Sequence, residues 1–157
     1  QAARLARTSG VRRIHVVPTT TIPQGISAMM AYDESAEIKD NVEAMQEAAS
    51  RVQSGSVTFA ARDSDYDGHQ IKEGELLALE NGKVAFTGTD LGSVTAKVAK
   101  DLMQEDSQFI TLLYGADVSE EQAADVEEAV RSLLPEEVEL TVAYGGQPVY
   151  YFLISVE

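Results

Sequence analysis

The sequence predicts an α/β fold: a mixed β-sheet with βαβ crossovers and antiparallel hairpins. Apolar runs of strand length alternate with amphipathic helical segments between Leu79 and Tyr144, an order typical of right-handed crossover connections. Asn81-Gly82 separates two alternating segments, which predicts a hairpin because a type I′ turn requires positive φ at both central residues. The 157 residues, 44% of them hydrophobic, are enough to build a buried core.

Residues 1–54 are expected to be the end of an α/β lobe whose beginning lies outside this sequence. Residues 1–9 resemble the last turns of an amphipathic helix that ends at Gly10. Residues 11–17 form an apolar run typical of a buried strand, and residues 26–32 have the composition of a short helix. Together they predict a unit of strand, loop and helix.

The clearest helix in the sequence follows this unit. Asp33 or Ser35 is expected to cap its amino terminus. Its apolar positions recur at helical spacing and are Ile38, Val42, Met45, Ala49 and Val52. Residues 54–56 (Ser-Gly-Ser) then have the composition of a hinge, so a second lobe is expected over residues 55–157.

The second lobe is expected to hold six strands and two helices. The predicted strands are residues 57–62, 75–80, 83–88, 108–114, 138–144 and 150–156. Thr89 or Asp90 is expected to cap the first helix, whose apolar face is Leu91, Val94, Val98 and Leu102. Ser119 and Gln122 have the spacing of a capping box, which opens a helix that ends before Pro135. The apolar face of this helix is Ala123, Val126, Val130 and Leu133.

The composition limits the classes of partner. Twelve Lys and Arg against 26 Asp and Glu give a net charge of −14, which repels nucleic acid and anionic lipid. Four arginines precede the first acidic residue, Asp33, an arrangement that permits a homodimer, although solvated arginines explain it more simply. No apolar run reaches the roughly 18 residues of a membrane-spanning helix, and the absence of Cys suits a cytoplasmic protein.

Neither of the two candidate metal sites in the sequence is convincing. Residues 63–68 have the acid spacing and the glycine of a calcium-binding loop, but Gly74 stands where a bidentate carboxylate is required. The acids are therefore interpreted as a solvated turn. His15 and His69 have no second ligand at zinc spacing, and His15 is expected on an inner strand as a hydrogen-bonded structural residue. No metal is expected.

Two loops are the candidate ligand-binding or partner-binding sites, and no residue is expected to be catalytic. The first lies between a strand and a helix, where hydroxyl and N–H groups suit an anion. A loop whose threonines only cap the helix is the favoured alternative, because the loop holds no basic residue. The second loop is the turn before the last strand. The residues are Thr19, Thr20, Thr21, Gln24 and Gly25 in the first loop and Gly145, Gly146 and Gln147 in the second.

Three stretches of the sequence resemble one known family. They are residues 17–25 (VPTTTIPQG), residues 62–63, 67–68 and 71–74 (RD, DG and IKEG), and residues 145–148 (GGQP) followed by 154–157 (ISVE). They resemble the carboxyl-terminal region of the bacterial ATP-binding subunit of fatty acid kinase, a family also described as dihydroxyacetone-kinase-like or DAK2-domain proteins. The resemblance extends over essentially the whole chain.

This resemblance implies a non-catalytic domain of a kinase. In that family an amino-terminal helical domain binds ATP and magnesium, so no cofactor is expected in this segment. The carboxyl-terminal region has a fold similar to DegV-type proteins. It engages a DegV-type fatty-acid-binding protein, and the upstream domains of its own chain are further partners. The implied function is docking of this carrier protein for acyl phosphorylation.

Two other interpretations stay open. A DegV-like fold is compatible with a small-ligand domain that binds a fatty acid or an anion, and the family's history also suggests an autonomous dihydroxyacetone kinase. Because the start of the first lobe is expected to be missing, an apolar surface near Ile14, Val16 and Ile26 is predicted to be covered by another chain segment.

Overall fold

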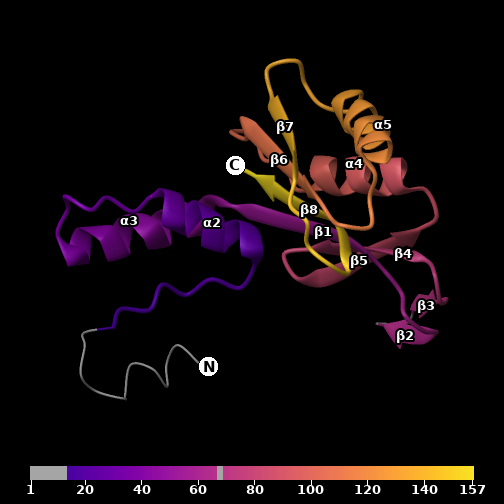
Figure 1. The fold of residues 1–157 in the computed structure, drawn as a ribbon, viewed down its shortest axis with the longest axis horizontal. Coiled ribbons are helices and arrows are strands. Elements are labelled where there is room, and N and C mark those ends of the chain that lie inside the picture. The colour runs from indigo at the N-terminus through magenta and orange to yellow at the C-terminus, as the bar shows by residue number, and fades with distance from the viewer. Residues whose placement is uncertain (1–13, 67–68) are drawn as a thin grey trace. The chain divides into compact units, whose positions relative to one another are not determined.

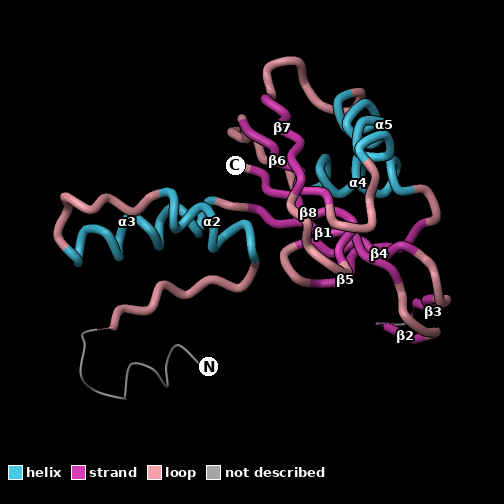
Figure 2. The backbone as a smooth tube through the Cα atoms, viewed as in Figure 1, coloured by secondary structure: helices cyan, strands magenta, loops and turns pink. Residues whose placement is uncertain are grey.

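The computed structural model describes residues 14–66 and 69–157 (Figures 1 and 2). The chain divides into two compact units, residues 1–52 and residues 53–157, and each is described by itself. Among the described helices, none is both long and apolar enough to cross a bilayer. The predicted α/β class with a mixed sheet is confirmed.

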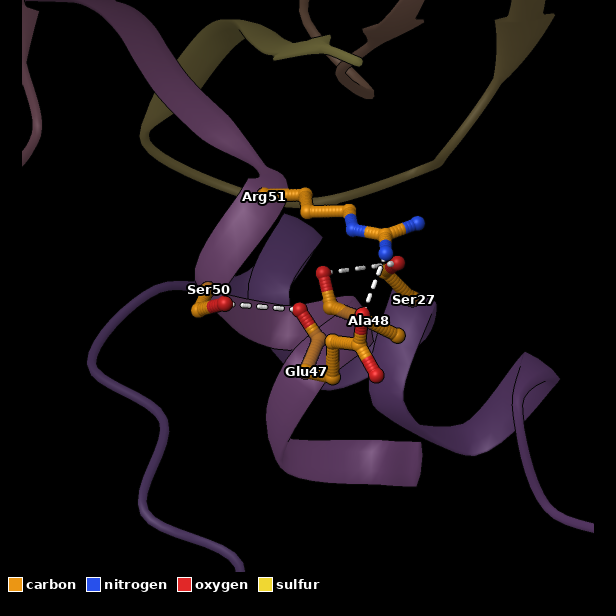
Figure 3. Close-up of polar contacts among 5 residues, drawn as sticks. All are labelled: Ser27, Glu47, Ala48, Ser50 and Arg51. Carbon is orange, nitrogen blue, oxygen red and sulfur yellow. Dashed lines mark hydrogen bonds and ion pairs between the residues drawn. The ribbon is translucent and has the colours of Figure 1, made fainter. Parts of the chain in front are cut away.

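The first unit contains two helices that pack against each other, α2 (Ile22–Met30) and α3 (Ile38–Arg51). The contact is made through small side chains: the Ser27 hydroxyl donates to the Ala48 carbonyl oxygen at 3.5 Å. Figure 3 shows this bond next to the ion pair between Arg51 and Glu47 on α3. Small residues at the contact allow the two helices to approach closely.

The predicted strand before α2 is wrong where it can be checked. Residues 14–17 have no strand conformation, and Ile14 and His15 are exposed. The other predicted strand residues, and the helix expected at residues 1–9, lie outside the described residues. A strand requires hydrogen bonds from a neighbouring strand, and no described segment of this unit supplies one.

Helix α2 begins four residues earlier than predicted. Thr21 is its N-cap, and Pro23 occupies the second helical position, where its fixed φ favours a helix and its missing N–H costs no hydrogen bond. Proline therefore belongs to the first turn here, although the sequence suggested that it belongs to the preceding loop.

The predicted caps of α3 are also wrong. Glu37 is the N-cap, without a hydrogen bond from its side chain. Asp33 instead accepts hydrogen bonds from the Ser35 hydroxyl (2.7 Å) and the Ser35 N–H (2.8 Å), which hold the pKa of its carboxyl below the ordinary value. The buried Asn41 side chain closes this turn: its Oδ1 accepts from the Asp33 N–H, and its Nδ2 donates to the Asp33 and Ala36 carbonyl oxygens.

The second unit is built on a six-stranded sheet with the order β5-β4-β1-β8-β6-β7. The β6 and β7 strands are parallel, and every other neighbouring pair in this sheet is antiparallel. A separate short hairpin pairs β2 with β3. The strands are β1 (Gln53–Phe59), β2 (Ser64–Tyr66), β3 (His69–Ile71), β4 (Leu76–Glu80), β5 (Lys83–Gly88), β6 (Phe109–Tyr114), β7 (Glu139–Tyr144) and β8 (Tyr150–Val156).

The turns and caps predicted in this unit are largely confirmed. Asn81 (φ 48°) and Gly82 (φ 82°) both have the positive φ of the predicted hairpin turn between β4 and β5. Asp90 caps α4 (Leu91–Asp101), and both hydrogen bonds of the predicted capping box open α5 (Glu120–Arg131). However, α5 ends at Arg131, well before Pro135, which leaves Leu133 exposed instead of buried.

The core lies between the sheet and the two helices of this unit. Figure 1 shows α4 and α5 side by side; α4 contacts β1, β4, β5 and β8, and α5 contacts β7. The side chains with no exposed surface include Val57, Val98, Leu112, Val130, Phe152, Ile154 and Val156. The parallel pair β6-α5-β7 is therefore the predicted βαβ crossover, and β4-β5 is the predicted hairpin at the opposite edge.

The expected hinge at residues 54–56 lies within β1 instead. A Cβ atom on Gly55 would lie 2.5 Å from Val98 Cγ1 and 2.9 Å from Leu102 Cδ1, so glycine is needed for α4 to pack against the sheet. The sequence suggested a flexible residue, but its small size is what the packing uses.

We predict that Gly55→Ala destabilises the second unit by about 1–3 kcal/mol, because the added methyl group overpacks the core. Gly25→Ala is the matched control. A Cβ there would lie 3.9 Å from its nearest neighbour, Thr19 Oγ1, so alanine should stabilise α2 by about 0.5–1 kcal/mol. Amide hydrogen exchange measures both units in one experiment; equal effects of the two variants would contradict the packing argument.

A pH dependence is predicted for the Asp90 cap. Hydrogen bonds from the Ser93 hydroxyl and N–H hold the pKa of this carboxyl below its ordinary value of 3.8. Because the folded pKa is the lower one, the cap contributes stability above the unfolded pKa and loses it as the pH falls through the folded pKa. NMR titration of the carboxyl carbon measures this pKa. Asp90→Asn keeps the acceptor but does not titrate, so it should lose less stability in acid; equal acid loss in both proteins would be the contrary result.

Candidate functional site

The first candidate loop is the amino terminus of α2. The Thr21 hydroxyl accepts from the Gln24 N–H at 3.4 Å, and the Gln24 Oε1 atom accepts from the Thr20 N–H at 2.9 Å and the Thr20 hydroxyl at 3.0 Å. The structure thus brings Thr20, Thr21 and Gln24 together in a reciprocal cap. Gly25 lies in the helix, where its N–H donates to the Thr21 carbonyl oxygen.

This geometry supports the capping interpretation of the loop. The side chains that an anion would require already satisfy the helix terminus, and no basic residue lies within the loop. The sequence contained the signal, because Thr21-x-x-Gln24 has the spacing of a capping box. Here the glutamine accepts from the residue before the N-cap instead of from the N-cap itself.

The second candidate loop connects β7 to β8 and is held tightly by the ends of the neighbouring strands. The Gly145 N–H donates to the Tyr114 carbonyl oxygen at 2.9 Å, and the Gln147 Nε2 atom donates to the Leu113 carbonyl oxygen at 2.8 Å. The Thr58 hydroxyl of β1 donates to the Val149 carbonyl oxygen at 2.8 Å. Gln147 is therefore an anchor of the loop, and its amide is not directed at a ligand.

The backbone of this loop is strained at Val149. Its φ is +73°, a region that a β-branched residue rarely adopts, and the Tyr150 N–H donates to the Pro148 carbonyl oxygen across it in a γ-turn. The loop also runs close to Gly115, where a Cβ atom would lie 2.7 Å from the Gln147 carbonyl oxygen. The strands around the loop impose a conformation that the isolated segment would avoid.

Exposed aromatic and apolar side chains surround this rigid loop. The Tyr144 side chain is 65% exposed, and its ring lies 5.4 Å from the Tyr114 ring, centroid to centroid. Val149 is 55% exposed. The sequence analysis selected the glycines and glutamine of the turn but missed these two side chains. The available signal was a tyrosine at the last position of an edge strand, next to a glycine pair.

The charge around the second loop is strongly negative. Residues 102–157 contain twelve acidic side chains and one basic side chain, Arg131. Arg131 donates to the Leu140 carbonyl oxygen at 3.2 Å, so it is used within the domain. The two candidate loops belong to different units, and the features of each are those of its own unit.

The acidic run expected to be a turn forms the short β2–β3 hairpin, of which residues 67–68 lie outside the described residues. The Asp63 carboxylate accepts a hydrogen bond from the Glu73 N–H at 2.7 Å. Within residues 14–66 and 69–157, no three His, Asp or Glu side chains are grouped as metal ligands. His15 lines a hollow of about 360 Å³ with Glu37, Lys39 and apolar neighbours, rather than lying on an inner strand.

Comparison with solved structures defines the class of protein. A DegV-family protein from Corynebacterium glutamicum superposes with a TM-score of 0.62 over 99% of this chain and 67% of its own, at 15% identity. A second DegV-family protein, from Ruminococcus gnavus and solved with vaccenic acid, gives a TM-score of 0.56 over 99% of this chain and 64% of its own, at 10% identity. The fold is that of the DegV-family proteins.

Sequence comparison identifies the family within this class. All 157 residues match the FakA-like carboxyl-terminal family, which is described by its relation to fatty acid kinase, and the chain belongs to this family. The relatives include SH1689 of Staphylococcus haemolyticus, 40% identical over 157 residues, and YloV of Bacillus subtilis, 35% identical over 156 residues. The chain spans 28% of the length of both relatives.

The strain at Val149 leads to a stability prediction. Val149→Gly should stabilise the second unit by about 1 kcal/mol, because glycine adopts positive φ without the steric cost and little buried surface is lost. Val84→Gly on β5 is the control and should destabilise, because that residue has an ordinary strand conformation. Urea unfolding measures both variants. Destabilisation by Val149→Gly would show that the turn is not strained.

Proposed function

We propose that this domain docks a DegV-type fatty-acid carrier protein for the kinase to which it belongs, and that it does so in the cytoplasm without catalytic residues of its own. The observation that carries the proposal is the family match over residues 1–157, which relates the chain to the carboxyl-terminal part of a fatty acid kinase. The nucleotide and magnesium would then be bound by another part of the longer protein.

The strained loop is the proposed contact surface. Binding energy in protein interfaces is concentrated in a few rigid, partly exposed aromatic and apolar side chains, because little conformational entropy is lost when they are buried. Tyr144, Pro148 and Val149 meet this condition, since the loop is anchored to three strands and these side chains are exposed. The loop before α2 contributes Thr19 and Thr20 as a second, polar contact.

The acidic surface specifies the electrostatic character of the carrier. With twelve acidic residues against one basic residue in residues 102–157, the domain favours a partner face rich in Lys and Arg. Such complementarity acts mainly on the association rate and is screened by salt, with a Debye length of about 8 Å at physiological ionic strength. Association is therefore expected to slow as salt is raised.

The prediction is tested by titrating the full-length natural protein with a purified DegV-family protein that carries vaccenic acid. Tyr144→Ala should weaken binding at least tenfold, because it removes an exposed ring from the contact. Phe109→Ala is the matched control: its ring is also exposed, but it lies at the start of β6, away from the loop, and its affinity should change less than twofold.

Two outcomes would reject this proposal. The first is the absence of binding at saturating carrier concentration together with full kinase activity after deletion of the domain. The second is direct binding of vaccenic acid by the domain, which would favour the small-ligand interpretation. Self-association that competes with the carrier would instead support a homodimer as the partner of this surface.

A further inference from the structure

Helix α2 carries an apolar stripe on its exposed side. Ile22, Ile26, Met29 and Met30 are spaced i, i+4, i+7 and i+8, which places them on one face of the helix. Ile22 is 52% exposed, Met29 66% and Met30 82%. We name these four residues the α2 stripe.

The other face of α2 shows that this arrangement is the reverse of an ordinary surface helix. The buried residues of α2 are Pro23, Ser27 and Ala28, and Ser27 donates its hydroxyl hydrogen bond to α3 (Figure 3). Small and polar side chains therefore meet the neighbouring helix, whereas the large apolar ones do not. A helix in a globular protein normally buries its apolar face, so the stripe lacks the layer that its sequence is suited to contact.

The stripe belongs to a wider concentration of exposed apolar side chains. Of the eleven large hydrophobic residues exposed in the described parts of the chain, six lie within residues 14–38. Besides three residues of the stripe they are Ile14, Tyr32 and Ile38. Contiguous apolar surface on a monomer marks an interaction site, whereas single exposed residues do not.

The comparisons show how much of the DegV-like fold has no counterpart in this chain. The superpositions cover 99% of its own length but 67% and 64% of the two DegV-family chains, so about a third of each is unmatched. The curated relatives extend further still, since the matched segment is 28% of their length. Additional polypeptide of the right class is thus available to cover the stripe.

We propose that the α2 stripe is an internal packing face, covered by a segment of the longer natural polypeptide that lies outside these 157 residues and supplies the unmatched third of the DegV-like fold. The chemistry of the stripe favours a covalently connected occupant. Helix α2 has no charged side chain, so it offers no electrostatic steering or charge selectivity to a diffusing partner. A connected segment needs neither, because its effective concentration is set by the linkage.

The test is photo-crosslinking in the full-length natural polypeptide, with p-benzoylphenylalanine in place of Met29. The matched control places the same group at Glu43, which is exposed on α3. Crosslinks from position 29 to peptides outside the 157-residue segment should exceed those from position 43 at least tenfold, and their yield should not depend on protein concentration. Since the experiment contains no carrier, its result is independent of the docking proposal.

Several results would overturn the inference. Crosslinks from position 29 to residues 53–157 would show that the domain covers its own stripe. A yield that rises with protein concentration would indicate a second copy of the chain. Equal crosslinking from positions 29 and 43 would show that the stripe stays exposed. If the bulky group disturbs folding, Met30→Glu provides a second measurement: a drop in the thermal midpoint of the full-length polypeptide is expected, and an unchanged midpoint contradicts the proposal.

Discussion

The second unit depends on the position of its last strand, β8, between β1 and β6. This strand pairs with both neighbours, and its side chains Phe152, Ile154 and Val156 are fully buried under the helices. It therefore joins the β4–β5 hairpin half of the sheet to the β6-α5-β7 crossover half. Since residues so far apart in sequence must pair, neither half has a complete core until the carboxyl terminus is in place.

The strained loop is a consequence of the same pairing. The chain leaves the edge strand β7, passes the end of β6 and enters β8 on the other side of it. It makes this passage over a few residues, anchored by Gln147 to β6 and by Val149 to β1. The positive φ of Val149 is thus imposed by strand order, and the rigidity that makes the loop suitable for binding has the same origin.

The two units offer different kinds of surface. The second unit combines a few rigid aromatic and apolar side chains with a strongly acidic field, which suits a separate protein that arrives by diffusion. The first unit presents the uncharged α2 stripe, which suits polypeptide that is already connected. A domain within a larger kinase needs both, one surface for the rest of its own chain and one for a partner.

The sequence alone determined the features that depend on neighbouring residues: the Asn81-Gly82 turn, the Asp90 cap, the Ser119 capping box and the apolar faces of α4 and α5. Local hydrogen bonds and φ preferences decide these, so they need no distant partner. Tertiary structure decided the rest. The apolar run before Pro18 is not a strand because no described strand pairs with it, and Gly55 is a packing position because α4 crosses above it. Val149 takes its conformation from strand order, which no local pattern encodes.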